Sequence, residues 1–178
     1  MNADDWQVVT GISSAVIALC ALGLSIWQGI LARTHNRLSF RPHLTTWVHS
    51  DAEKGFYAVE LINNGIGPAV IEEFSVKVDG KLVSGDGTEP IAKALKIVFP
   101  NLPYRSQQSY LATGYSMAPK ERCTVIAVQF LGQPLPSKEF VEHAIDRGDL
   151  EISYKSFYDE RFPFSTQEEK SKKLLQPT

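Results

Sequence analysis

The chain has 178 residues, with 18 Lys and Arg against 20 Asp and Glu, and a formal net charge of −2. This balance excludes a strongly basic nucleic-acid-binding protein, and the sequence has no basic cluster with interleaved aromatic residues. The two cysteines, Cys20 and Cys123, do not form a disulfide framework, and the four histidines lack metal-ligand spacing. We therefore expect no nucleic acid among the partners, no metal and no cofactor.

A run without charged residues, from 8 to 32, dominates the N-terminal part of the chain. As a helix, its roughly 25 residues would extend for about 37 Å, which is enough to cross a bilayer core. Trp6 and Trp27 fall where the two membrane interfaces would lie. We predict a short leader over 1–7 and a single transmembrane helix over 8–32. The alternatives are a buried helix of a soluble protein and a cleaved signal peptide, but the leader is acidic where a signal peptide is basic.

Positive charges follow the apolar run. Arg33, Arg37 and Arg41 lie in a basic juxtamembrane linker that we assign to 33–42, whereas the leader contains acids and no Lys or Arg. Cationic residues resist translocation, so we expect a single-pass protein of the cell inner membrane with its N-terminus outside and its C-terminal domain in the cytoplasm. The arginines are also candidates for contact with anionic headgroups of the lipid bilayer.

Small residues recur along the apolar run at alternating spacings of three and four, which places them on one face of a helix. Such a stripe lets two helix backbones approach closely in lipid, so it favours a homo-oligomer formed through the transmembrane helix. Because small residues are common in membrane helices, the stripe is equally compatible with a monomer. The stripe consists of Gly11, Ser14, Ala18, Ala21 and Ser25.

The remaining chain predicts one domain over 43–166, and its first strands alternate apolar and polar residues over 44–48 and 56–62. The segment 63–69 (NNGIGPA) is interpreted as a structural turn, because its glycines permit positive φ. A phosphate-binding loop is the alternative, but it requires a helix to follow, and 70–78 alternates as a strand. Asp79-Gly80 then predicts a tight hairpin turn that returns through 81–83.

This part of the sequence carries a family resemblance. Residues 59–69 (VELINNGIGPA) and 74–80 (FSVKVDG) resemble the core of bacterial immunoglobulin-like sandwiches, of which the CARDB-type adhesion-related domains are one example. The whole arrangement resembles small bacterial single-pass membrane proteins with such a sandwich. The resemblance implies an antiparallel immunoglobulin-like fold, and it supplies neither an activity nor catalytic residues that could be transferred to this chain.

The second half alternates short helices and strands. A helix capped by Thr88 is expected over 89–99, and another, capped by Ser137 and with Phe140 facing inward, is expected up to Arg147. An apolar run predicts a central strand buried on both faces, and the tail is expected to be disordered or a loose helix. The expected strands are 109–115, 123–131, 150–157 and 162–165, and the polar tail is 167–178.

These elements predict a mainly β protein, an antiparallel immunoglobulin-like β-sandwich with two short helix insertions behind a transmembrane helix. Sandwiches of this kind present surfaces, so we expect a non-enzymatic interaction or scaffold module that binds another protein. The excess of aromatics near the C-terminus makes Tyr158, Phe162 and Phe164 a candidate partner surface. One alternative is an oligomerising membrane effector of the stress or phage-defence type, triggered through its soluble domain. A second alternative is an enzyme of unknown class, for which Asp159, Glu160 and Arg161 are the nearest to a catalytic group.

Overall fold

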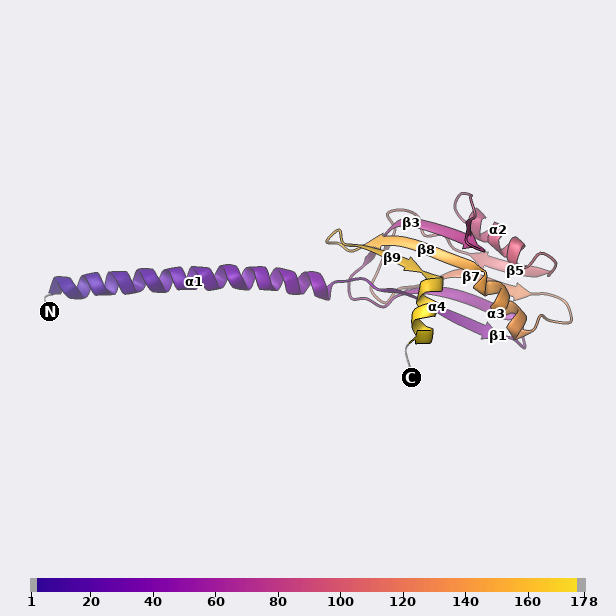
Figure 1. Cartoon of the computed structure of the whole chain (residues 1–178), viewed down its shortest axis with the longest axis horizontal. Helices are drawn as coiled ribbons and strands as arrows, with labels where there is room; N and C mark the ends of the chain where they lie inside the picture. Colours follow the sequence, from indigo (N-terminus) through magenta and orange to yellow (C-terminus); the bar gives the residue numbers. More distant parts are fainter. Residues whose placement is uncertain (1–2, 176–178) are drawn as a thin grey trace. The chain divides into compact units, whose positions relative to one another are not determined.

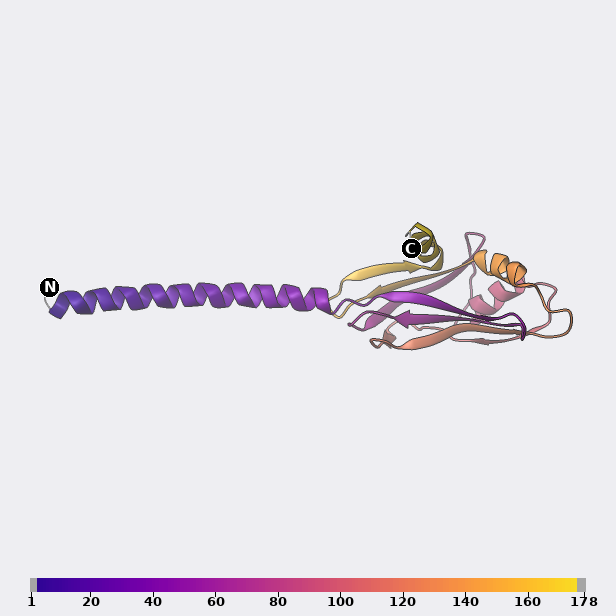
Figure 2. The ribbon, with the colours of Figure 1, turned by 90° about the horizontal axis from the view of Figure 1, so that it is seen from below.

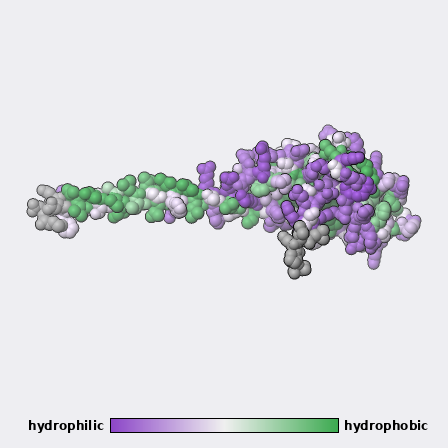
Figure 3. Space-filling model, viewed as in Figure 1, coloured by the Kyte–Doolittle hydropathy of each residue, from purple (hydrophilic) through white to green (hydrophobic). Residues whose placement is uncertain are grey.

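The computed structural model describes residues 3–175, and the chain divides into two units between Ser39 and Phe40. The first unit is one helix, α1 (Ala3–Ser39), drawn in indigo in Figure 1. Apolar side chains cover most of it, as the green atoms in Figure 3 show, and its most apolar window is not buried. By length and composition α1 is able to cross a membrane, a criterion that a signal sequence near an N-terminus also meets.

The helix is longer than the predicted span of 8–32. It includes most of the expected leader, and in the expected linker the chain stays helical up to Ser39. The residues after the apolar run are mainly ordinary helix formers, and Pro42 is the first residue that cannot continue a helix. The linker is thus largely a helical extension, and only its last three residues belong to the second unit.

The second unit contains two antiparallel sheets, seen as separate layers in Figure 2. The first has the order β1 (Leu44–Asp51), β2 (Phe56–Asn63), β7 (Arg122–Phe130) and β5 (Tyr104–Gln108). The second has the order β4 (Lys81–Leu82), β3 (Ala69–Val78), β8 (Gly148–Lys155) and β9 (Arg161–Ser165), and β6 (Ser116–Met117) also pairs with β3. The predicted antiparallel sandwich is therefore confirmed at the level of two stacked antiparallel sheets.

Three helices complete the unit: α2 (Glu89–Val98), α3 (Lys138–Asp146) and α4 (Thr166–Leu175). α2 and α3 lie at the same end of the sandwich, and α4 follows β9 directly (Figures 1 and 2). The two predicted insertions are confirmed as α2 and α3. The polar tail, expected to be disordered or a loose helix, contains the helix α4 within its described residues, and residues 176–178 lie outside the described part.

The core lies between the sheets, where apolar side chains from both inner faces point toward each other. Buried faces of α2 and α3 extend it at one end. Fully buried members include Leu61 and Val125 from the first sheet, Ile71 and Ile152 from the second, Ile91 from α2 and Val141 from α3.

Two local predictions are confirmed in detail. Asp79 and Gly80 have φ values of 51° and 75° and join β3 to β4 as a tight turn. The Ser137 side chain accepts a hydrogen bond from the backbone N–H of Phe140, which caps α3 as expected. Thr88 differs, since it makes no side-chain capping bond. A carboxylate oxygen of Glu89 instead accepts from the backbone N–H of Asp86 at 3.3 Å.

Three strand and helix assignments need correction. The predicted strand 109–115 is wrong: β5 precedes it, β6 follows it, and Gly114 at φ 86° turns the chain between them. β5 is a polar edge strand, so it lacks the alternation that reveals a strand in sequence. β7 is central as predicted, but it is fully buried on one face only. Phe140, predicted to face inward, is half exposed on α3.

Candidate functional site

The residues predicted at the membrane interface separate into two groups. Trp6, Trp27, Arg33 and Arg37 lie on α1, where both tryptophans are exposed. Arg41 lies beyond the helix in the second unit. Its guanidinium donates two hydrogen bonds to the Glu160 carboxylate, at 3.1 and 3.3 Å, so its charge is already compensated within the domain.

The five small residues of the predicted stripe, from Gly11 to Ser25, all lie within α1. A helix turns by about 100° per residue, so their spacing keeps them on one face. The Ser25 hydroxyl donates to the carbonyl oxygen of Ala21 at 2.8 Å and so adds no unsatisfied polar group to the stripe. A Cβ at Gly11 would meet no atom within 4 Å, so the helix itself does not require a glycine there.

The candidate catalytic residues do not form a cluster. Asp159 accepts a hydrogen bond from Lys155 at 2.7 Å, and this contact lowers the pKa of Asp159. Glu160 is paired with Arg41, and Arg161 donates to Glu72 at 2.9 Å. Three neighbouring residues thus have three separate partners, as expected for the surface turn between β8 and β9. Within residues 3–175, no group of three or more His, Cys, Asp or Glu is placed to hold a metal ion.

The loop after β2 is held together by Asn63, whose side chain is completely buried. Its amide nitrogen donates to the carbonyl oxygens of Gly67, Met117 and Ala118 at 2.9 to 3.3 Å. Its amide oxygen accepts from the backbone N–H groups of His43 (3.1 Å) and Gly65 (3.0 Å). One side chain therefore ties the loop to the start of β1 and to the end of β6, which is a structural role.

The glycines of this loop are required for a reason other than the predicted one. Neither Gly65 nor Gly67 has positive φ. A Cβ at Gly67 would instead overlap the carbonyl oxygen of Phe40, and one at Gly65 would overlap that of Arg41. The segment 63–69 is a packed structural turn, and β3 rather than a helix follows it, so the phosphate-loop alternative has no helix N-terminus to use.

Exposed apolar side chains gather at the end of the domain where its chain begins, which we call the Phe40 end. The loop after β2 touches Phe40, and the β8–β9 turn reaches the same place through the Arg41–Glu160 pair. We define the Phe40 end by Phe40, Ile66, Phe157 and Tyr158, all exposed, with Phe157 at 72%. Paired charges, Arg41 with Glu160 and Arg161 with Glu72, accompany them.

The three aromatics predicted as a partner surface have different environments. Tyr158 is exposed at the Phe40 end, whereas Phe164 is 8% exposed and belongs to the core. Phe162 is partly buried and stacks on Tyr154, with ring centroids 5.5 Å apart. Phe164 is therefore excluded from that surface. Phe157 and Ile66 were not assigned to a partner surface from the sequence.

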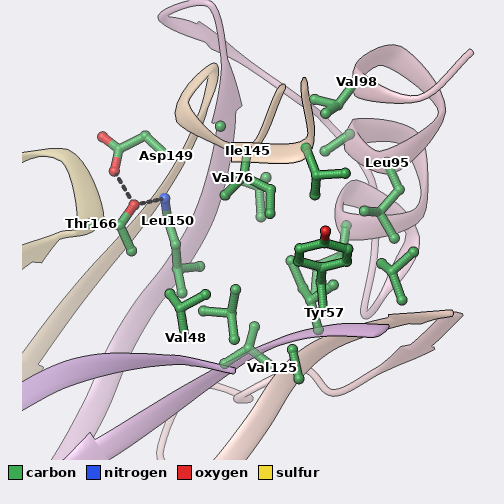
Figure 4. A pocket seen from close by; sticks show the side chains of 18 of the residues that line it. Val48, Tyr57, Val76, Leu95, Val98, Val125, Ile145, Asp149, Leu150 and Thr166 are labelled. Atoms are coloured by element: carbon green, nitrogen blue, oxygen red, sulfur yellow. Dashed lines mark hydrogen bonds between the residues drawn. The ribbon is translucent and has the colours of Figure 1, made fainter. Parts of the chain in front are cut away.

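A cavity of about 120 Å³ lies between the two sheets, next to α2 and α3. Figure 4 shows its wall, which is apolar over most of its surface, with Val76, Leu95, Val98, Val125 and Ile145 around it. Asp149 and Thr166 lie at one side of it (Figure 4). The Thr166 hydroxyl donates to Asp149 at 2.8 Å and accepts from the backbone N–H of Leu150 at 3.0 Å.

Tyr57 differs from the other polar residues of this wall because its hydroxyl has no hydrogen-bond partner among the described residues. The side chain rises from β2 with its hydroxyl directed into the space (Figure 4), and the residue is only 3% exposed. Its ring packs edge-on against Phe130 at a centroid distance of 5.9 Å, which fixes its direction. Within the described part of the chain, Tyr57 Oη has no hydrogen-bond partner. Burial, and then the charges of Glu142, Glu139 and Asp51, raise the pKa of Tyr57.

Comparison of the sequence with protein-family models finds no match, and comparison with curated proteins finds none either. The resemblance of residues 59–80 to immunoglobulin-like sandwiches therefore stays an expectation from the sequence.

Proposed function

We propose that this protein is a membrane-anchored, non-enzymatic interaction module, in which α1 spans the inner membrane and the β-sandwich is presented in the cytoplasm. The observation that carries the proposal is the unburied apolar surface of α1. In water such a surface would be strongly unfavourable, whereas in a bilayer it needs no protein cover. Trp6 and Trp27 suit the two interfaces, and Arg33 and Arg37 in the last turns of α1 favour a cytoplasmic domain.

The Phe40 end is the surface that we assign to the partner. It has an apolar aromatic centre with charged residues that are already paired, a composition typical of protein interfaces. A surface built for anionic lipid would instead carry free cationic side chains. Because Phe40 directly follows α1 in the chain, we infer a partner that is itself present at the membrane. The proposed partner is therefore a membrane protein.

The immunoglobulin-like assignment is part of this proposal. Its support is the segment that carries the resemblance: β2, a packed turn, β3 and an Asp79-Gly80 hairpin occur in the order that the family implies. Adhesion-related domains of this kind are extracellular for the most part, so the resemblance lends a fold class and not an activity.

Reporter fusions test the anchoring and the orientation. A cytoplasm-dependent fluorescent protein fused after Thr178 should be bright, and a periplasm-dependent phosphatase fused there should be inactive. Replacing Arg33, Arg37 and Arg41 with Ser and placing Lys at Asp4 and Asp5 should invert or mix this result. An active phosphatase on the native sequence would contradict the orientation, because it would place the domain outside. A fusion recovered entirely in the soluble fraction would contradict the membrane anchoring by α1.

Site-specific photo-crosslinking tests the partner surface. A photoreactive phenylalanine at Phe157 of the full chain in membranes should yield a discrete protein adduct, which Ile66→Ser should weaken. The control position is Leu82, equally apolar and exposed but on β4. Adducts to lipid alone at Phe157 would contradict a protein partner, as would equal adducts at the two positions.

An oligomerising effector is the second candidate, and the observation that favours it is the single-face stripe of small residues on the unburied α1. Helices in lipid associate through such faces, because small side chains allow close contact. Ala18→Leu with Ala21→Leu should abolish crosslinked dimers in membranes, whereas Leu19→Ala with Leu22→Ala should not. Loss of a toxic effect of overexpression in the first variant would favour the effector over the interaction module.

A further inference from the structure

We propose that the cavity between the sheets is a binding site for a small uncharged molecule with an apolar body and one hydroxyl or carbonyl group, held by the Tyr57 hydroxyl. The inference stands on a cavity of about 120 Å³ and on a buried tyrosine whose hydroxyl points into it without a partner. It is independent of the membrane proposal, because every group that it uses lies within the sandwich.

The other polar side chains of the cavity wall already have partners within the protein. Lys170 pairs with Asp146 at 2.6 Å, and Thr46 donates its hydroxyl to Glu169 at 2.6 Å. Thr166 is engaged with Asp149, as described above. Among the described residues of the wall, Tyr57 therefore offers the side-chain polar atom that remains for a guest. Its raised pKa keeps it a neutral phenol at ordinary pH, able either to donate or to accept.

The surroundings of Tyr57 Oη favour an organic guest over water. A buried water is stable where about two to four polar groups hold it, and an apolar wall with one hydroxyl supplies too few. An apolar guest with a single polar atom satisfies the hydroxyl and the wall together. Cavities of roughly 150 Å³ accept molecules the size of benzene, so this one suits a guest of about six or seven heavy atoms.

The cavity wall includes exposed side chains on the side of β1 and α4. Val48 is half exposed and Lys170 partly exposed, yet both line the cavity. Lys170 belongs to α4, which follows the last strand and contacts β8 and β9. We therefore expect a guest to reach the cavity on this side, past the exposed side chains of Val48 and Lys170.

The test uses phenol and toluene, which are close in size and differ by a hydroxyl in place of a methyl group. The full chain, in nanodiscs and with labelled methyl groups, is titrated with each while methyl NMR signals are recorded. Both probes should shift Val76, Leu95 and Val125 saturably and leave the exposed Leu82 unmoved. Phenol should bind about tenfold more tightly than toluene relative to their partition into the lipid, because it alone bonds Tyr57.

Two variants complete the test. Tyr57→Phe should remove the preference for phenol and leave toluene binding unchanged. Tyr154→Phe is the matched control, since Tyr154 is equally buried but its hydroxyl accepts from the backbone N–H of Leu44 at 3.5 Å outside the cavity. It should leave both affinities unchanged. Equal binding of phenol and toluene by the native chain, or no saturable shift with either, would overturn the proposal without any variant.

Discussion

The two ends of β2 bury polar side chains in opposite ways. At one end Asn63 is surrounded by carbonyl oxygens and N–H groups that use its whole amide. At the other end Tyr57 directs a hydroxyl into an apolar space. A buried polar group stabilises a fold when it is fully bonded and destabilises it when it is not. The Asn63 end of β2 is therefore held rigidly by hydrogen bonds, whereas the Tyr57 hydroxyl stays available for the guest that we propose.

Among the variants that test this contrast, Asn63→Ala should have the largest effect on stability. The change removes the side-chain partner of two backbone N–H groups and of three carbonyl oxygens, of which the Ala118 oxygen still accepts from the Glu121 N–H at 3.2 Å. We expect a loss of about 4 kcal/mol in the free energy of unfolding. Chemical denaturation of the purified protein measures it. Asn64→Ala is the matched control, because the Asn64 side chain is exposed and donates to the Thr45 hydroxyl, so its removal should cost under about 1 kcal/mol. Similar losses in the two variants would contradict the special role of Asn63.

Gly67→Val should come next, at about 3 kcal/mol, because the new Cβ overlaps the backbone of Phe40 and forces the loop to move. Glu72→Ala should cost under about 1 kcal/mol, as expected for a surface ion pair, here with Arg161 at 2.9 Å. Thermal unfolding of the two variants under one condition gives the comparison. If Gly67→Val unfolds at the same temperature as Glu72→Ala, the close approach at Gly67 is not needed for the fold.

Tyr57→Phe should change stability little or raise it by up to about 1 kcal/mol, since it removes a hydroxyl that the fold leaves unsatisfied. Tyr154→Phe removes a bonded hydroxyl and should cost about 0.5 to 1.5 kcal/mol. Denaturant midpoints measure both. A clear destabilisation by Tyr57→Phe would mean that its hydroxyl has a partner in solution.

The smallest expected effect is on the pH dependence, and it separates the causes that raise the pKa of Tyr115 and of Tyr57. At the Asn63 end, the hydrogen bond from the Tyr115 hydroxyl to the Glu121 carboxylate raises the pKa of Tyr115 to about 12, whereas burial is the main cause at Tyr57. A raised pKa of Tyr115 in the folded state means that its contribution is complete below about pH 10 and disappears as the pH rises toward 12. Glu121→Gln should lower the pKa of Tyr115 and leave that of Tyr57 raised, as followed by tyrosine ring NMR signals against pH. An unchanged pKa of Tyr115 would exclude Glu121 as the cause.

Sequence periodicity was sufficient for the elements whose apolar residues face one side. Leu150, Ile152 and Tyr154 alternate in sequence and are buried in β8, and Ile91, Leu95 and Val98 form the buried face of α2. The same method failed for β5, because an edge strand of polar residues has no such alternation. It also failed for α4, which has a polar sequence and is held by contacts from elsewhere in the chain, such as Glu169 with Thr46.

The candidate site was less accessible to sequence reasoning. The alternation of 56–62 places Tyr57 on the same strand face as Val59 and Leu61, but whether its hydroxyl finds a partner depends on distant residues of α2, α3 and β8 that border the cavity. The turn at Gly67 was recognised from its composition, although the reason for the glycine is close contact with Phe40 rather than positive φ. In both cases the sequence was insufficient because tertiary contacts, unlike strand alternation, leave no periodic signal.

The contact between Glu169 and β1 has a consequence for how copies of this chain meet. β1 is the edge of its sheet, and the Thr46 backbone N–H and hydroxyl both donate to the Glu169 carboxylate, at 2.9 and 2.6 Å. An unpaired edge is a template for a strand from another molecule, and a negative charge on it repels the carbonyl oxygens of that strand. Molecules confined to one membrane collide far more often than molecules in solution. In the membrane plane that we propose, the Glu169 carboxylate of α4 would therefore oppose the addition of a strand from a second copy at Thr46.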